Sequence, residues 1–337
     1  MAFPSVSVII PAYNAQDSIG EALEAISRQG YSGQIETIVV DDGSTDGTAE
    51  KIRTFEQVRY IRQVNAGPAS ARNSGARAAA YEILLFTDSD CRPEPDWVEK
   101  MVAGFSVEGV GVVAGSYGIA NSSAPLARFI HGEIIFRHKN LMPDFPRAFG
   151  SYNFAISRDL FESIGGFDVS FRNASGEDND LSYKVLLQGR KIRFFRDALV
   201  AHYHQEDLAR YLKEQCRHGF WRAKIYIIHP GMAAGDDYTF WKDMVEVPVA
   251  FLHVALLLWP GIWVGLAAGF LVFELGWGFL IFHNVSDAIF GGLVMWCRAF
   301  ARAAGLAVGG IYFLIIYLRR NTPLKMSKKT CGEKRVC

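Results

Sequence analysis

The chain has 337 residues with 35 basic and 35 acidic side chains, and half of its residues are hydrophobic. A net charge of zero excludes a globally basic nucleic-acid-binding protein, so no nucleic-acid partner is expected. The length allows one large α/β domain and an appendage. The five cysteines show no metal-ligand spacing and no disulfide framework, which fits a reducing compartment.

Strand and helix patterns alternate through the first 90 residues. Short apolar, β-branched runs predict strands at 6–10, 35–40, 58–62 and 83–86, and helical spacing predicts helices at 18–28, 48–55 and 70–80. This alternation predicts an α/β fold with a doubly wound, mostly parallel sheet and flanking helices. Ligands of such sheets bind beyond the carboxyl ends of the strands, where aspartates follow two of the predicted strands.

The pattern is mixed between residues 95 and 228. It predicts helices at 97–105, 158–164 and 178–188, and strands at 111–117, 150–157, 192–195 and 199–202. Residues 207–228 form an amphipathic pattern in which basic residues alternate with aromatic and aliphatic ones. That pattern fits a helix on an anionic membrane surface and equally a helix that packs on the protein.

The last third of the chain is the most apolar part. Residues 245–273 are nearly free of charge but contain Pro248 and Pro260, so they either span a bilayer once with a kink or fold back as a hairpin. Residues 303–318 form a second span, and a basic tail follows. Basic segments stay on the cytoplasmic side, and the N-terminal residues lack the basic start of a signal peptide. We therefore expect about two spans in the inner membrane, with the catalytic domain and the tail in the cytoplasm.

These patterns divide the chain into four parts. The expected parts are a catalytic domain (1–204), an amphipathic interfacial segment (205–244), a transmembrane region (245–318) and a basic cytoplasmic tail (319–337). Membrane lipids are therefore expected partners of the C-terminal part.

The sharpest chemical signal is the triplet Asp88-Ser89-Asp90 at the end of a predicted strand. Two carboxylates one residue apart can share a hard divalent cation. Such a cation neutralises the charge that develops on a departing diphosphate. Alone the triplet is a weak signal, because similar triplets occur in solvated turns. Its place after an apolar strand and the motifs around it favour a metal site.

From residue 5 to about 203 the chain resembles the family-2 glycosyltransferases, which are inverting enzymes of the GT-A fold. The matching stretches are VSVIIPAYN (6–14), VDDGSTD (40–46), NAGPASARNSG (65–75), TDSD (87–90) and GGFD (165–168) leading into GEDNDL (176–181). The apolar appendage resembles that of bacterial enzymes that assemble exopolysaccharide on lipid carriers. The resemblance implies a nucleotide-sugar donor, a Mn²⁺ or Mg²⁺ cofactor and a lipid-linked saccharide acceptor.

The resemblance also implies a nucleotide pocket near the N-terminus. Pro11, Ala12 and Tyr13 would line the base pocket, with Tyr13 offering a flat face for stacking. Asp42 would accept a hydrogen bond from the base, and the imide N–H of uracil suits a carboxylate. Gly67 would let the backbone approach the ligand. Uridine diphosphate is the usual carrier in the family, while guanosine and thymidine forms stay open.

Further residues are assigned to the diphosphate and metal by the same resemblance. Asp88 would hold the ribose and Asp90 the metal, and Arg72 would pair with the donor or with nearby carboxylates. His202 would complete the metal shell, with His204 as its rival. Each residue also has a plain structural interpretation, a surface arginine or a satisfied core histidine.

Asp178 is the candidate general base of an in-line displacement, because an attacking hydroxyl needs a carboxylate to take its proton. Its neighbour Glu177 would orient the acceptor or the base. Both residues also fit a helix N-terminus, where carboxylates are favoured. The next segment, Gln215 to Trp221, departs from the Gln-x-x-Arg-Trp motif of processive members, so addition of a single sugar is expected.

Two other functions remain open from the sequence. A polyprenyl-phosphate glycosyltransferase would use an acceptor that is already an anion and would need no base. A non-catalytic membrane scaffold would keep the fold without turnover.

Overall fold

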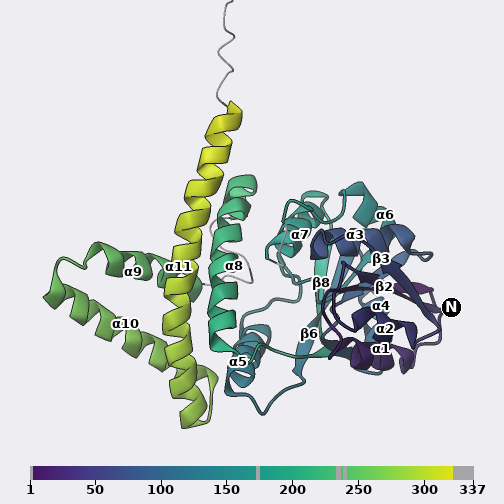
Figure 1. Ribbon diagram of the computed structural model, residues 1–337, viewed down its shortest axis with the longest axis horizontal. Helices are drawn as coiled ribbons and strands as arrows, with labels where there is room; N and C mark the ends of the chain where they lie inside the picture. Colours follow the sequence, from purple (N-terminus) through teal and green to yellow (C-terminus); the bar gives the residue numbers. More distant parts are fainter. Residues whose placement is uncertain (1–2, 172–174, 233–236, 238–240, 322–337) are drawn as a thin grey trace, which may run out of the picture.

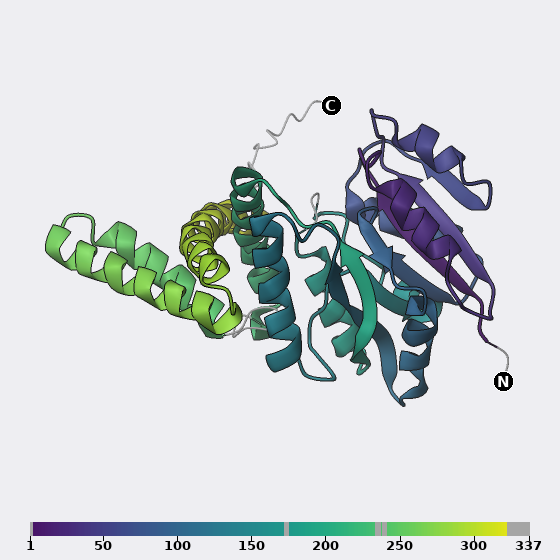
Figure 2. The same cartoon turned by 90° about the horizontal axis from the view of Figure 1, so that it is seen from below.

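The structure is a computed structural model that describes residues 3–171, 175–232, 237 and 241–321 (Figure 1). The basic tail expected at 319–337 lies outside the described residues from residue 322 onward. The described chain forms a sheet domain at one end and a group of long helices at the other (Figures 1 and 2).

The core of the sheet domain is one eight-stranded sheet with the order β3-β2-β1-β4-β7-β6-β8-β5. Its strands are β1 (Val6–Ala12), β2 (Ile35–Asp41), β3 (Val58–Arg62), β4 (Ile83–Thr87), β5 (Cys91–Pro93), β6 (Val110–Ile119), β7 (Asn153–Ser157) and β8 (Lys191–His202). Strands β3, β2, β1 and β4 are parallel, whereas β7 runs antiparallel to both of its neighbours. The mostly parallel α/β sheet predicted from the sequence is therefore confirmed.

Helices flank this sheet and continue beyond it. They are α1 (Ile19–Ser27), α2 (Thr48–Arg53), α3 (Pro68–Ala78), α4 (Trp97–Ala103), α5 (Pro125–Asn140), α6 (Arg158–Ser163), α7 (Glu177–Leu187), α8 (Leu208–Ile228), α9 (Trp241–Ala255), α10 (Pro260–Ile281) and α11 (Val285–Asn321), with short 3₁₀ turns at Gly104–Ser106 and Pro230–Met232. The helices expected within the first 90 residues all form, with ends shifted by two residues or fewer.

The expectation of two late strands at 192–195 and 199–202 is wrong. One strand, β8, covers both segments, and its pairing with β6 jumps from Gly115–Phe195 to Ser116–Leu199. The intervening residues bulge out without ending the strand. The side-chain amide of Asn153 stabilises this bulge by donating to the carbonyls of Ser116 and Ala198 at 3.0 and 2.8 Å. Strand β5, which pairs with β8, was not expected.

Two long helices lie side by side between the sheet domain and the outermost helices (Figure 1). Helix α8, the amphipathic segment of the sequence, packs along α11. Of its two interpretations, the structure favours the helix that packs on the protein. Helix α5 lies next to this pair, and Phe129 of α5 packs with Tyr211 of α8 and Met295 of α11 in one buried cluster.

The apolar run after residue 245 folds back on itself. Helix α9 contains Pro248, turns at residues 256–259 and returns as α10, so the hairpin is formed and the single kinked span is not (Figure 2). The last helix begins at Val285 and not near residue 303 as expected. Charged residues extend it, because they find partners there: Asp287 accepts from Arg128 of α5 at 2.8 Å.

Two helices, Pro260–Ile281 and Val285–Arg319, are long and apolar enough to cross a membrane. Only 17% and 22% of their most apolar windows are buried within the protein. A core helix of a soluble protein would be mostly buried, so the exposure of these helices favours contact with lipid.

Candidate active site

The nucleotide-pocket residues expected from the sequence meet at one edge of the sheet. Ala12, at the end of β1, pairs in register with Asp41, at the end of β2, and the Ala12 carbonyl accepts from the backbone N–H of Asp42 at 2.8 Å. Tyr13 follows Pro11 and Ala12 and is 52% exposed, so the face of its ring is accessible for stacking. The edge therefore brings Tyr13 and Asp42 together from two strands.

Asp42 is buried and already engaged by the loop before α3. Its carboxylate accepts from the backbone N–H groups of Ala66 and Gly67 at 2.9 and 2.8 Å, and from the side chain of Gln63 at 2.7 Å. Gly67 has φ of +91°, which a residue with a Cβ rarely adopts. Asp42 thus shapes the loop that carries Gly67, in addition to any contact it makes with a base.

Arg72 joins the Asp-Ser-Asp loop to the start of α7. It lies on α3 and is 3% exposed. It donates to Asp88 at 2.8 Å and to Glu177 at 3.0 Å. The planar guanidinium suits such a two-sided bridge because its donors lie in a fixed fork. The bridge connects the two acidic segments, which lie 89 residues apart along the chain.

Asp90 and His202 form the candidate metal site. The pairing of β5 with β8 brings them together, with Asp90 Oδ1 3.4 Å from His202 Nε2. His202 Nδ1 lies 3.1 Å from His204 Nδ1, which holds the imidazole in place. Oxygen and imidazole nitrogen are donors that Mn²⁺ accepts, so these residues fit a divalent cation.

Cys91 also lies within reach of this group, with its ligand atom within 4.8 Å of those of Asp90 and His202. Burial raises the pKa of the Cys91 thiol well above its ordinary value, and the Asp90 carboxylate adds to that shift. A thiol is a metal ligand only as a thiolate. Without a bound cation, Cys91 is a fully buried thiol of β5 that lies beside the candidate metal site.

Asp178 lies in the first turn of α7, next to the buried Glu177. Burial raises the pKa of Asp178 to about 7, and the negative charge of Glu177 adds to that shift. Glu177 is held by Arg72 and by the backbone N–H of Ser175 at 2.7 Å. A carboxylate whose pKa lies near neutrality can accept and later release a proton at working pH.

A cavity of about 610 Å³ begins at these carboxylates and extends to the long helices. Arg72, Asp88, Glu177 and Asp178 line its catalytic end. Its other walls come from α5, α8, α9 and α11. The cleft that an acceptor would need thus lies directly beside the candidate base.

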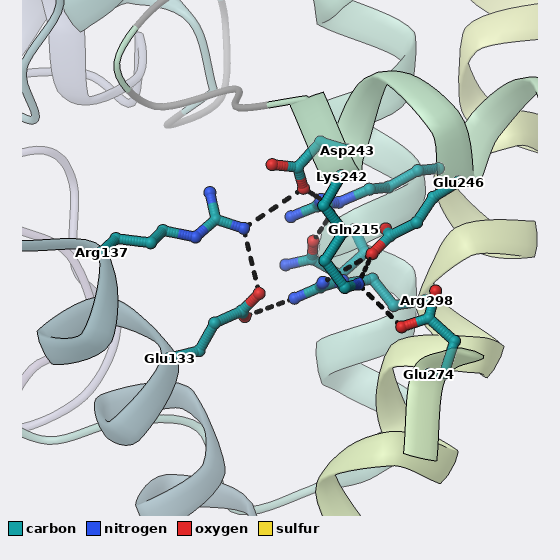
Figure 3. Close-up of polar contacts among 9 residues, drawn as sticks. Glu133, Arg137, Gln215, Lys242, Asp243, Glu246, Glu274 and Arg298 are labelled. Carbon is teal, nitrogen blue, oxygen red and sulfur yellow. Dashed lines mark hydrogen bonds and ion pairs between the residues drawn. The ribbon is translucent and has the colours of Figure 1, made fainter. Parts of the chain in front are cut away.

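Charged residues of the long helices form a cluster that was not predicted from the sequence (Figure 3), and part of this cluster lines the cavity. The charged cluster comprises Glu133, Arg137, Lys242, Asp243, Glu246, Glu274, Arg298 and Arg302 together with Gln215. The available signals were the lone acid Glu274 in an apolar helix and the i, i+4 spacing of Arg298 and Arg302. Charges inside apolar helices usually mark function or close pairing.

The fold and this site together define a class of enzyme: a glycosyltransferase with a GT-A-like fold, which transfers a sugar from a nucleotide sugar. Over residues 7–165, within the sheet domain, the chain matches the model of Glycosyl transferase family 2, and its relatives include bacterial and archaeal glycosyltransferases.

Individual relatives agree with this assignment. Glycosyltransferase AglE of Haloferax volcanii is 28% identical over 231 residues, which cover 67% of this chain and 75% of AglE. Glycosyltransferase GlyA of Streptococcus pneumoniae is 27% identical over 267 residues, which cover 73% of this chain and 38% of GlyA. The chain therefore spans well under half of GlyA.

A solved structure shares the fold over nearly the whole length. It is the mannosyltransferase PcManGT from Pyrobaculum calidifontis in complex with GDP-Man and Mn²⁺, with a TM-score of 0.59 and 20% identity. The match covers 92% of this chain and 88% of PcManGT. A match of 92% reaches into the region of the long helices, because residues 208–321 are far more than the uncovered part of the chain.

Proposed function

We propose that this protein is an inverting, metal-dependent glycosyltransferase that adds a single sugar to a hydroxyl of a lipid-linked saccharide at the cytoplasmic face of the membrane. The observation that supports it is the placement of Asp178 in a cavity that also contains Asp88 and reaches the apolar helices. The donor is a nucleotide diphosphate sugar, and the carboxylate of Asp42, at the same sheet edge as Tyr13, is compatible with uracil.

In this mechanism the acceptor hydroxyl attacks the anomeric carbon opposite the diphosphate. The bond from that carbon to the diphosphate breaks as the new carbon–oxygen bond forms, and Asp178 takes the hydroxyl proton. Arg72 holds Glu177 and Asp88 in place, which positions the base relative to the donor. A divalent cation held by Asp90 and His202 would neutralise the charge on the departing diphosphate.

A neutral hydroxyl acceptor fits the cavity better than a phosphate acceptor. Five arginines and six acidic residues line the cavity. Arg72, Arg137 and Arg302 have acidic partners at 2.8, 3.0 and 2.6 Å, and Arg298 pairs with Glu133. An anionic acceptor would have to compete with these pairs and would meet the carboxylates of Glu177 and Asp178.

The helix after the base supports addition of one sugar. Gly219 packs closely against α11. A Cβ at this position would clash with α11, because it would lie 2.1 Å from the Arg302 carbonyl oxygen. Trp221 packs against Phe171 and Phe313, with ring centroids 5.4 and 5.7 Å away, and does not line the cavity. Trp221 is therefore engaged in helix packing, which is compatible with the departure from the motif of processive members.

A donor screen tests this proposal. Full-length protein in lipid nanodiscs is given uridine, guanosine and thymidine diphosphate sugars with and without Mn²⁺, and release of the nucleotide diphosphate is measured. We expect metal-stimulated release from at least one donor. A scaffold would release none from any donor, and that outcome would overturn the enzymatic function.

A further inference from the structure

The cavity joins two chemically different surfaces. Its lining includes the carboxylates of Asp88 and Asp178 and also apolar side chains of α5 and α9. Ile130 and Ile134 of α5 are one helical turn apart and therefore lie on one face. A cavity that runs from a catalytic carboxylate to an apolar wall can hold a molecule with a polar and an apolar part.

Helix α9 carries a defined apolar stripe in this wall. Met244, Val247, Pro248 and Phe251 all line the cavity, and their spacing of i, i+3, i+4 and i+7 places them on one helix face. Met244 and Phe251, at the two ends of the stripe, are still 37% and 39% exposed, so the protein's own packing leaves these two side chains uncovered. The cavity is therefore open along α9.

The surroundings of this opening identify the medium that it faces. Next to the stripe, α9 exposes Val245, Leu252 and Val254, and the turn that follows exposes Leu257 and Leu258. The next two helices are those long and apolar enough to cross a bilayer. An apolar surface of this extent beside such helices fits lipid acyl chains, since soluble proteins rarely leave such patches open.

Part of the charged cluster also lines the cavity, on the same helices as the apolar residues. Arg137 donates to Glu133 and Asp243, and Arg302 donates to Asp243 and Gln215 (Figure 3). The paired charges leave the wall close to neutral while it still presents many donors and acceptors. A wall of this kind suits the hydroxyl groups of a sugar, which donate and accept without carrying charge.

We propose that α5 and α9 form a lateral opening through which a membrane amphiphile reaches the active site. Its saccharide head lies along Arg137, Asp243 and Gln215 with the reacting hydroxyl at Asp178. Its hydrocarbon chain leaves the cavity over the stripe of Met244, Val247, Pro248 and Phe251. This inference rests on the proposed function, whose acceptor it describes, and it assigns the residues that select a lipid-linked acceptor over a free sugar.

Photolabelling tests the path directly. The probe is a dodecyl glucoside with a diazirine at the end of its chain, added to the full-length protein in lipid nanodiscs, irradiated and located by mass spectrometry of the peptides. We expect labelling of α5 around Ile134 and of α9 between Met244 and Phe251. Labelling confined to the outer faces of α10 and α11 would overturn the proposal.

A matched pair of variants separates the path from general lipid contact. Val247→Asp places a charge in the stripe and should lower α9 labelling by ~10-fold or more, because burying an unpaired carboxylate among apolar groups is costly. Val245→Asp places the same charge on the same helix outside the cavity lining and should leave the labelling unchanged. Val247→Trp fills the stripe without a charge and should also lower the labelling. Equal loss in the Val245 and Val247 variants would refute the path.

Hydrolysis of the donor by water is measured in the same nanodiscs, so the two proposals fail separately. Labelling of α9 without any turnover of a nucleotide sugar would refute the proposed transferase function but not the lateral opening. Turnover without labelling of α5 or α9 would refute the lateral opening but not the transferase function.

Discussion

Gly305 of α11 lies directly against Cys216 of α8: a Cβ added to Gly305 would lie 1.9 Å from the Cys216 carbonyl oxygen. Gly309, one turn further, is equally close to Phe220, at 2.3 Å from its carbonyl oxygen. Small residues four apart let two helix backbones touch, and this contact is common among helices in membranes. The pair therefore fixes α8, the helix that follows the last strand of the sheet, against α11.

Gly305→Ala should push α8 away from α11 and lower the free energy of unfolding by about 1–3 kcal/mol, the usual cost of overpacking. Gly310→Ala is the control on the same helix, because open space surrounds a Cβ at that position. Replacing that glycine should leave stability unchanged or raise it by up to about 1 kcal/mol through helix propensity. Thermal unfolding in detergent measures both, and equal effects would show that the contact is not tight.

Asp178→Asn should lower transfer to a hydroxyl acceptor by about 10²–10⁴-fold, the contribution of a positioned general base. The affinity for the donor should change little, since the amide keeps the shape of the side chain. The exposed Asp17→Asn is the control and should be fully active. Retained transfer in the Asp178 variant would favour a phosphate acceptor, which needs no base.

The pH dependence of activity should follow Asp178. Burial, together with the Glu177 charge, raises the pKa of Asp178 to about 7. The base must be ionised, so kcat/KM should fall as the pH drops through 7 in wild type. The residual activity of Asp178→Asn should not show this decrease at low pH. A pH profile between 5 and 9 in a constant-ionic-strength buffer measures it.

The same raised pKa predicts a change in stability with a defined sign. The folded state holds the Asp178 proton more tightly than the unfolded state, so ionising this carboxyl lowers stability as the pH rises from about 4 to 7. Asp178→Asn should therefore raise the melting temperature at pH 8 by a few degrees and change it little at pH 4. A larger gain at pH 4 would contradict the raised pKa.

Removal of the metal should abolish turnover, and Mn²⁺ should restore it. His202→Ala and Asp90→Asn should each weaken Mn²⁺ binding by roughly 10-fold or more, because each removes one of few protein ligands. His283→Ala, at an exposed position, is the control. Titration of Mn²⁺ followed by electron paramagnetic resonance measures metal binding independently of turnover. An unchanged affinity in both variants would show that the metal binds at another site.

Arg72→Lys should lower kcat by about 10-fold, because an ammonium group cannot bridge Asp88 and Glu177 with two arms of a rigid fork. Arg77→Lys lies on the same helix at an exposed position and should behave as wild type. Steady-state kinetics separates the outcomes. A change confined to KM would assign Arg72 to donor binding and not to positioning of the base.

Local patterns in the sequence were enough to locate the first four strands and to propose the candidate site residues near the ends of strands and helices. Apolar runs located β1 to β4 within two residues, because a buried parallel strand must be apolar along its whole length. The same reasoning placed Asp42 and Asp88 beyond strand ends and Asp178 at a helix start. These features depend on the few residues around each position.

Tertiary structure alone decided which of these residues meet. The partners of Arg72 come from segments far apart in the chain, and the charged cluster pairs α5 with α9 and α11 across more than a hundred residues. The local spacing of residues in the sequence does not predict such pairings. From the sequence alone, Glu274 and Arg298 are only charged residues within apolar helices. The hairpin of α9 and α10, the close contact of Gly305 with Cys216 and the cavity beside Asp178 arise from packing between elements, which becomes visible only when the whole chain is folded.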